Sequence, residues 1–205
     1  SKAVLTLANG QMIPLGKETT DSTIITDGTQ ISASGSGITY VGGGESDAVV
    51  YNKLEIPRGG EFCLTLSDGT RAWLNSETSI QYPVVFGAKE RRVFIQGEAY
   101  FEVAKDAKKP FTVQFMSSSV TVLGTSFNIR AYPEEKQSQT TLAEGSVRIY
   151  SPGSSMLLKP GEQAEVNALS GEMVKKEVEV KTFTSWKDGR FVFEQEPLEN
   201  IMRTL

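Results

Sequence analysis

An apolar or small side chain at every second position over residues 93–103 limits the fold of this chain more than any other sequence feature. The odd positions of this stretch hold Val93, Ile95, Gly97, Ala99, Phe101 and Val103, and the even positions include Gln96, Glu98 and Glu102. Alternation with period two is typical of a β-strand with one buried face, because successive side chains point to opposite sides of a sheet. Gly97 interrupts the apolar row and indicates a bulge or the close approach of another backbone.

Shorter stretches repeat this alternation, and turn signals separate them. Apolar residues alternate over 111–115, 127–131 and 147–149. The pairs Asn9-Gly10, Asp27-Gly28 and Asp68-Gly69 lie between β-prone segments, and such pairs tolerate the positive φ angles of tight hairpins. We therefore expect mostly strands between Leu5 and Lys181, and an all-β domain. The spacing fits a β-sandwich or jelly-roll-like arrangement and equally a twisted β-solenoid-like one.

Composition excludes several kinds of chemistry. The chain of 205 residues has no histidine and one cysteine, Cys63. Nucleophile systems that rely on histidine, zinc sites built on imidazole, cysteine metal clusters and an internal disulfide are therefore impossible. The net charge of −4 disfavours nucleic acid as a partner, because nucleic acid needs a positive face. We expect no enzymatic activity, no metal and no cofactor.

Apolar runs are too short for a membrane-spanning helix. The longest have four or five residues, as at residues 82–86, whereas about 20 are needed to cross a bilayer. The sequence also begins without a signal peptide. We expect any targeting segment and any membrane anchor to lie outside it.

Charged residues on and around the strand at 93–103 are interpreted as solvated. Glu98 and Glu102 share one strand face, with Cα atoms roughly 13 Å apart, which is too far for the carboxylate pair of a glycosidase. Basic clusters flank the strand on both sides: Lys89, Arg91 and Arg92 before it, and Lys105, Lys108 and Lys109 after it. Such clusters more often mark strand ends that discourage edge pairing than a docking patch for an acidic partner.

The pattern changes near the C-terminus. Residues 186–193 resemble a turn followed by a strand, and Pro197 opens a short apolar stripe at helical spacing: Leu198, Ile201, Met202 and Leu205. This change predicts two units, an all-β domain over residues 1–182 and the start of a small α/β subdomain over residues 183–205.

Five motifs occur in a fixed order: GEAYFEV at 97–103, KPFTV at 109–113, VLGTSFNI at 122–129, LAEGSV at 142–147 and LKPGEQA at 158–164. This series resembles the periplasmic region of FecR-type anti-sigma factors. Residues 57–75 are similar to the version found in glycan-uptake systems that depend on TonB. Glycine and phenylalanine positions in these motifs are interpreted as structural, for turns or the core: Gly97, Phe101, Gly124, Phe127, Gly145 and Gly161.

The resemblance implies a function that composition does not indicate. Members of this family are single-pass inner-membrane proteins whose cytoplasmic domain binds an extracytoplasmic-function sigma factor. The signalling domain of an outer-membrane TonB-dependent transporter contacts the periplasmic region, and regulated proteolysis then frees the sigma factor. By this resemblance, we expect the sigma-binding domain and the membrane helix to lie outside the sequence. Residues from 186 onward resemble a subdomain related to secretin and TonB-receptor N-terminal domains, so the expected partner-binding residues are Phe191, Phe193, Leu198 and Ile201.

A carbohydrate-binding β-sandwich is the main alternative function. Four aromatic residues would line its sugar platform: Trp73, Tyr82, Tyr100 and Tyr132. A cupin-like enzyme is disfavoured, because its metal normally needs histidines.

Overall fold

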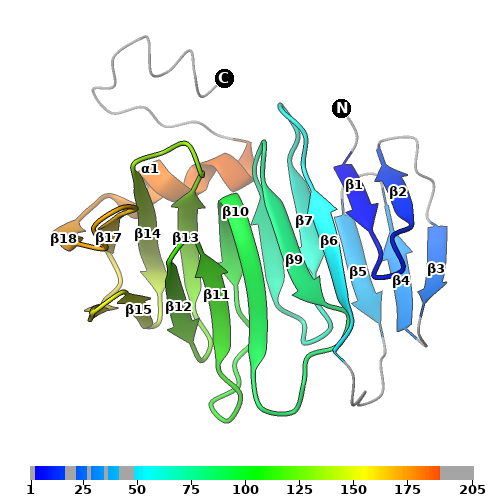
Figure 1. The fold of residues 1–205 in the computed structure, drawn as a ribbon, viewed down its shortest axis with the longest axis horizontal. Coiled ribbons are helices and arrows are strands. Elements are labelled where there is room, and N and C mark those ends of the chain that lie inside the picture. Colours follow the sequence, from blue (N-terminus) through cyan, green and yellow to red (C-terminus); the bar gives the residue numbers. More distant parts are fainter. Residues whose placement is uncertain (1–2, 17–21, 27–28, 35–36, 42–48, 190–205) are drawn as a thin grey trace.

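The chain folds into two β-sheets that lie face to face (Figure 1). The computed structural model describes residues 3–16, 22–26, 29–34, 37–41 and 49–189. These residues hold 18 strands and a short helical segment, so the expectation of an all-β domain is confirmed. The predicted C-terminal helix after Pro197 lies outside the described residues.

The first sheet, called sheet A, is mostly antiparallel. In spatial order its strands are β2 (Met12–Leu15), β1 (Ala3–Thr6), β6 (Tyr51–Glu55), β9 (Ser79–Pro83), the first half of β10 (Arg91–Glu102), β11 (Phe111–Phe115), β12 (Ser118–Val122), β15 (Val147–Ser151) and β16 (Ser154–Leu158). The β10–β11 pair is parallel.

The second sheet, called sheet B, covers sheet A. Its order is β3 (Ser22–Thr26), β4 (Thr29–Ala33), β5 (Gly37–Val41), β7 (Phe62–Thr65), β8 (Arg71–Leu74), the second half of β10, β13 (Ser126–Ala131), β14 (Gln137–Glu144), β17 (Glu162–Asn167) and β18 (Met173–Glu177). Only the β5–β7 pair is parallel among these pairings. The two sheets form facing layers, and in each of them the strand numbers rise almost steadily from one edge to the other.

Strand β10 belongs to both sheets and joins them. Residues 94–96 pair with β9 in sheet A, and residues 97–102 pair with β13 in sheet B. The change occurs at Gly97, which has a φ of 107°. A Cβ at residue 97 would lie 2.7 Å from the Thr78 Cα, so of the two alternatives the structure shows the close approach of another backbone.

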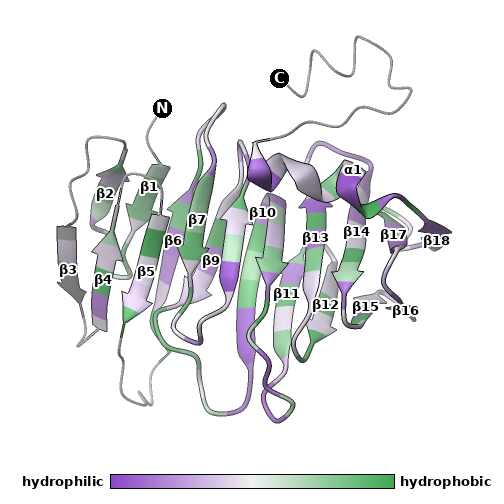
Figure 2. Ribbon diagram, turned by 180° about the vertical axis from the view of Figure 1, so that it is seen from behind, coloured by the Kyte–Doolittle hydropathy of each residue, from purple (hydrophilic) through white to green (hydrophobic). Residues whose placement is uncertain are grey.

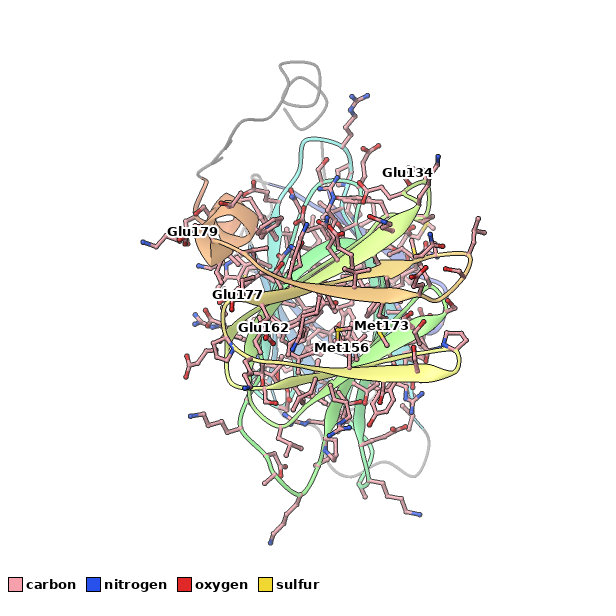
Figure 3. The ribbon with its side chains drawn as sticks, turned by 90° about the vertical axis from the view of Figure 1, so that its left-hand side faces the viewer. Glu134, Met156, Glu162, Met173, Glu177 and Glu179 are labelled. Atoms are coloured by element: carbon pink, nitrogen blue, oxygen red, sulfur yellow. The ribbon has the colours of Figure 1, made fainter. Side chains whose placement is uncertain are left out.

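One hydrophobic core fills the space between the sheets. The predicted inward row of β10 is buried, including Val93, Ala99 and Phe101. Phe101 stacks on Phe127 of β13, with 5.4 Å between ring centroids. Viewed at the end of the sandwich, Met156 of β16 and Met173 of β18 lie between the two layers (Figure 3). Because burial of apolar area is the main stabilising term in folding, this continuous core holds the two sheets together.

Arg91 corrects the prediction that the basic cluster before β10 is solvated. Its side chain is only 2% exposed. One guanidinium nitrogen, Nη1, donates to the Asp68 carboxylate and to the Ala104 carbonyl, both at 2.8 Å, and Nε donates to the Lys109 carbonyl at 2.8 Å. The burial is tolerated because Nε and Nη1 of the planar guanidinium both have hydrogen-bond acceptors.

The chain leaves the sandwich through two short helices, α1 (Val180–Thr184) and the 3₁₀ turn η1 (Ser185–Asp188). Figure 2 shows α1 in front of the upper ends of β13 and β14. The predicted boundary after residue 182 falls inside α1, and the division into two units stays a prediction. Within the described ranges, no helix is long and apolar enough to cross a membrane.

Candidate functional site

The helical segment at residues 180–188 docks on the outer face of sheet B. The Glu179 side chain caps α1 by accepting a hydrogen bond from the backbone N–H of Lys181. Gly189, with a φ of 68°, ends η1 and donates its N–H to the Trp186 carbonyl at 2.9 Å. A helix this short does not persist alone in water, so the segment depends on its contacts with the sheet.

Trp186 provides the main contact. It is the one buried residue of the two helices in the described part of the chain, and 7% of it is exposed. Its indole N–H donates to Oδ1 of Asn128 on β13 at 3.1 Å. A buried tryptophan that satisfies its N–H contributes both apolar area and orientation.

Asn128 connects Trp186 to the carboxylate of Glu98, on β10. Oε1 accepts a hydrogen bond from the Asn128 amide at 2.9 Å, and Oε2 accepts one from the Asn75 amide at 3.0 Å. The Arg130 guanidinium lies 3.3 Å from Oε2 and also pairs with Glu135. Because Asn128 donates to Glu98 and accepts from Trp186, the orientation of its amide is fixed on both sides. We call Glu98, Asn75, Asn128 and Arg130 the socket.

Burial determines the protonation behaviour of Glu98. Loss of hydration raises the pKa of this carboxyl above its ordinary value, and Arg130 and the two amides partly offset that rise. The prediction that Glu98 is solvated is wrong, since only 6% of it is exposed. Its hydrogen-bond partners come from other parts of sheet B, Asn75 after β8 and Asn128 and Arg130 on β13, which strand periodicity does not reveal. Glu102, by contrast, forms a surface ion pair with Arg71.

Aromatic rings border the socket. Trp73 of β8 and Tyr100 of β10 meet edge to face, with 5.9 Å between centroids. The Lys187 ammonium lies over both rings, 5.5 Å from the Trp73 centroid and 5.2 Å from the Tyr100 centroid. This cation–π contact fastens η1 beside the tryptophan.

The aromatic platform proposed for carbohydrate binding does not form. Tyr82 is fully buried between the sheets, where its hydroxyl meets that of Tyr40 at 2.9 Å. Tyr132 is also buried and donates its hydroxyl to the Ser76 carbonyl at 2.8 Å. The Trp73–Tyr100 pair lies under Lys187, so the four rings share no open face.

The motif residues singled out in the sequence lie at backbone turns and in the core. Phe101 and Phe127 are fully buried. The glycines all have positive φ: Gly97, Gly124, Gly145 and Gly161. The expected partner-binding residues lie outside the described part of the chain: Phe191, Phe193, Leu198 and Ile201.

Metal-ligating and nucleophilic side chains are scattered. In the described ranges, no three His, Cys, Asp or Glu side chains are placed to hold a metal ion. Cys63 is half-buried, and burial raises the pKa of its thiol, which makes the reactive thiolate harder to form.

Known proteins share this fold and part of the sequence. Residues 52–148 match the FecR protein family. Two crystal structures of a protein assigned as an anti-sigma factor from Parabacteroides distasonis are similar, both with a TM-score of 0.69. One is 35% identical and the match covers 75% of this chain and 72% of that one; the other is 36% identical, with 74% and 71% covered. The chain belongs to the FecR family of anti-sigma factors. No curated protein matches it.

The FecR match includes the whole socket but ends before the tryptophan that binds Asn128. Asn75, Glu98, Asn128 and Arg130 all fall within residues 52–148, whereas Trp186 lies beyond them. Asn128 belongs to the motif at 122–129, and sequence reasoning assigned it no role. A lone tryptophan in a polar stretch just after the last strand is the signal that could have indicated the docked segment.

Proposed function

We propose that this chain is the periplasmic sensor region of a single-pass inner-membrane anti-sigma factor. In this proposal it relays a signal from an outer-membrane TonB-dependent transporter to an extracytoplasmic-function sigma factor. The sigma factor binds a cytoplasmic domain outside this sequence, and a regulated protease releases it. The chain itself acts by binding, without enzymatic activity or a cofactor.

Membership of the FecR family supports the regulatory role, and the docked segment supports the position of the signalling contact. Trp186 and Gly189 set the point at which the chain leaves sheet B. Lys187, two residues before Gly189, lies over Trp73 and Tyr100. In our proposal, the residues after Gly189 contact the signalling domain through Phe191, Phe193, Leu198 and Ile201.

Binding between purified proteins tests this function. The signalling domains of the TonB-dependent transporters of the same organism are titrated one by one against the periplasmic region. We expect one of them to bind, and we expect the double variant Phe191→Ala/Phe193→Ala to weaken that binding by at least about 10-fold, as loss of an aromatic anchor does.

Leu169→Ala is the matched control, because Leu169 is 98% exposed in the turn between β17 and β18. It should bind as the parent chain does. The proposal is wrong if no signalling domain binds. If the double variant binds with unchanged affinity, the signalling domain contacts the sandwich and not the residues after Gly189.

A further inference from the structure

One buried side chain, Trp186, anchors the helical segment on the sandwich, and half-buried residues of α1 and a cation–π contact support it. Helix α1 has no buried residue, and η1 buries only Trp186 among the residues that the structure describes. The second fastening is the Lys187 ammonium above Trp73 and Tyr100. Most helices bury a whole apolar face, so this attachment is weak for its length.

The socket does not depend on the segment for its own structure. Glu98, Asn128 and Arg130 lie on β10 and β13, and Asn75 comes directly after β8. Their hydrogen bonds to the Glu98 carboxylate run between strands of sheet B. When Trp186 leaves, Oδ1 of Asn128 loses its partner and becomes open to water, while those three bonds stay in place.

We propose that residues 180–188 form a releasable latch, which plugs the socket with Trp186 and opens while both sheets stay folded. Docking fixes the chain at Gly189 against sheet B, and opening frees it. The role of opening in signalling rests on the proposed function above: it changes how the residues after Gly189 meet their partner. The latch itself is a property of this chain alone.

Hydrogen exchange measured by NMR on the chain of 205 residues tests the latch. The probes are hydrogen-bonded in the docked segment: the backbone amides of Thr182, Ser185 and Gly189, and the indole N–H of Trp186. The chain has two tryptophans, so the Trp186→Phe spectrum assigns the indole signal. We expect these probes to exchange at least about 100-fold faster than core amides of β13, because the segment opens without global unfolding.

Two variants examine the anchor. Trp186→Ala should speed exchange of the three amides a further 10-fold or so and leave β13 unchanged, because the segment then has no buried side chain. Asn128→Asp places a carboxylate against Glu98 and should open the latch in the same way. Its matched control is Asn167→Asp, which adds the same charge at a turn where Oδ1 only accepts hydrogen bonds, from Leu169 and Ser170.

The latch is refuted if the probes exchange as slowly as β13 in the parent chain, since the segment would then open only when the whole domain unfolds. It is also refuted if Trp186→Ala leaves their exchange unchanged. Neither result affects binding of a transporter signalling domain. Conversely, failure of every signalling domain to bind overturns the proposed relay and leaves the latch standing.

Discussion

Gly97 passes so close to Thr78 that a Cβ at residue 97 would lie 2.5 Å from the Thr78 hydroxyl oxygen. That hydroxyl accepts a hydrogen bond from the Glu98 N–H at 2.9 Å and donates one to the Glu98 carbonyl at 3.1 Å. The exchange occurs where β10 leaves sheet A for sheet B. The Thr78 hydroxyl thus provides hydrogen bonds for the backbone N–H and C=O of Glu98 at the point where the strand changes sheets.

Gly97→Ala should destabilise the domain by about 3 kcal/mol or more, because it combines a strained positive φ with a clash against Thr78. Urea unfolding followed by far-UV circular dichroism measures the loss. Gly153→Ala is the matched control, since Gly153 has a φ of 78° and nothing within 4 Å of its added Cβ. It should lose only about 1 kcal/mol. Equal losses would show that the approach of Thr78 has no effect on stability.

The buried Arg91–Asp68 pair gives a second prediction. Arg91→Lys keeps the charge but removes the planar donors that reach Lys109 and Ala104, so it should cost about 2–4 kcal/mol. Arg92→Lys is the matched control, because Arg92 pairs with Glu90 at the surface, and it should change stability by less than about 0.5 kcal/mol. Chemical denaturation of both variants measures the difference. A loss below that of Arg92→Lys would contradict the role assigned to the buried guanidinium.

Periodicity predicted the strands because each strand has one face against the core. The row Val93, Ile95, Ala99 and Phe101 shows that face directly, and Gly97 showed where the row bends. Local sequence carries this information, since side chains alternate within each strand.

Periodicity could not predict which tertiary partners surround the buried polar residues of β10. Both Glu98 and Arg91 depend on partners from other elements. Asn128, which also binds Trp186, donates to Glu98, and Asp68 pairs with Arg91. Tyr82 was expected at a binding surface but lies in the core. A tyrosine ring suits either place, provided that its hydroxyl has a partner in the core, as it has here in Tyr40. Which of the two occurs is decided by tertiary contacts.

A core polar network gives a third prediction. The Tyr40 hydroxyl accepts from the Asn52 amide at 2.8 Å and meets the Tyr82 hydroxyl at 2.9 Å. Tyr40→Phe removes the hydrogen bond that the Asn52 amide and the Tyr82 hydroxyl each make with Tyr40, and should cost about 2 kcal/mol. Tyr82→Phe removes only the last hydroxyl of this network and should cost less than about 1 kcal/mol. Each variant lacks one hydroxyl oxygen relative to the parent chain, so their thermal unfolding can be compared directly. The reverse order would show that Asn52 does not depend on Tyr40.

The dependence of stability on pH gives a fourth prediction. Burial raises the pKa of Glu98 in the folded state, so the folded state holds its proton more tightly than the unfolded chain does. The free energy of unfolding then gains a contribution that is complete below the ordinary glutamate pKa and is lost as pH rises through the raised value. Glu98→Gln cannot titrate, so its stability lacks this contribution at every pH.

We therefore expect the difference in unfolding free energy, parent minus Glu98→Gln, to increase as pH falls from 7.5 to about 4.5. Glu98→Gln also changes the hydrogen bonds to Asn75 and Arg130, but that effect shifts the difference equally at all pH values. The other carboxyl groups titrate in both chains, so their contributions to the unfolding free energy largely cancel in the difference. Urea titrations at four or five pH values measure the difference. A difference that shrinks as pH falls would mean that Arg130 and the amides outweigh burial and hold the pKa of Glu98 below its ordinary value.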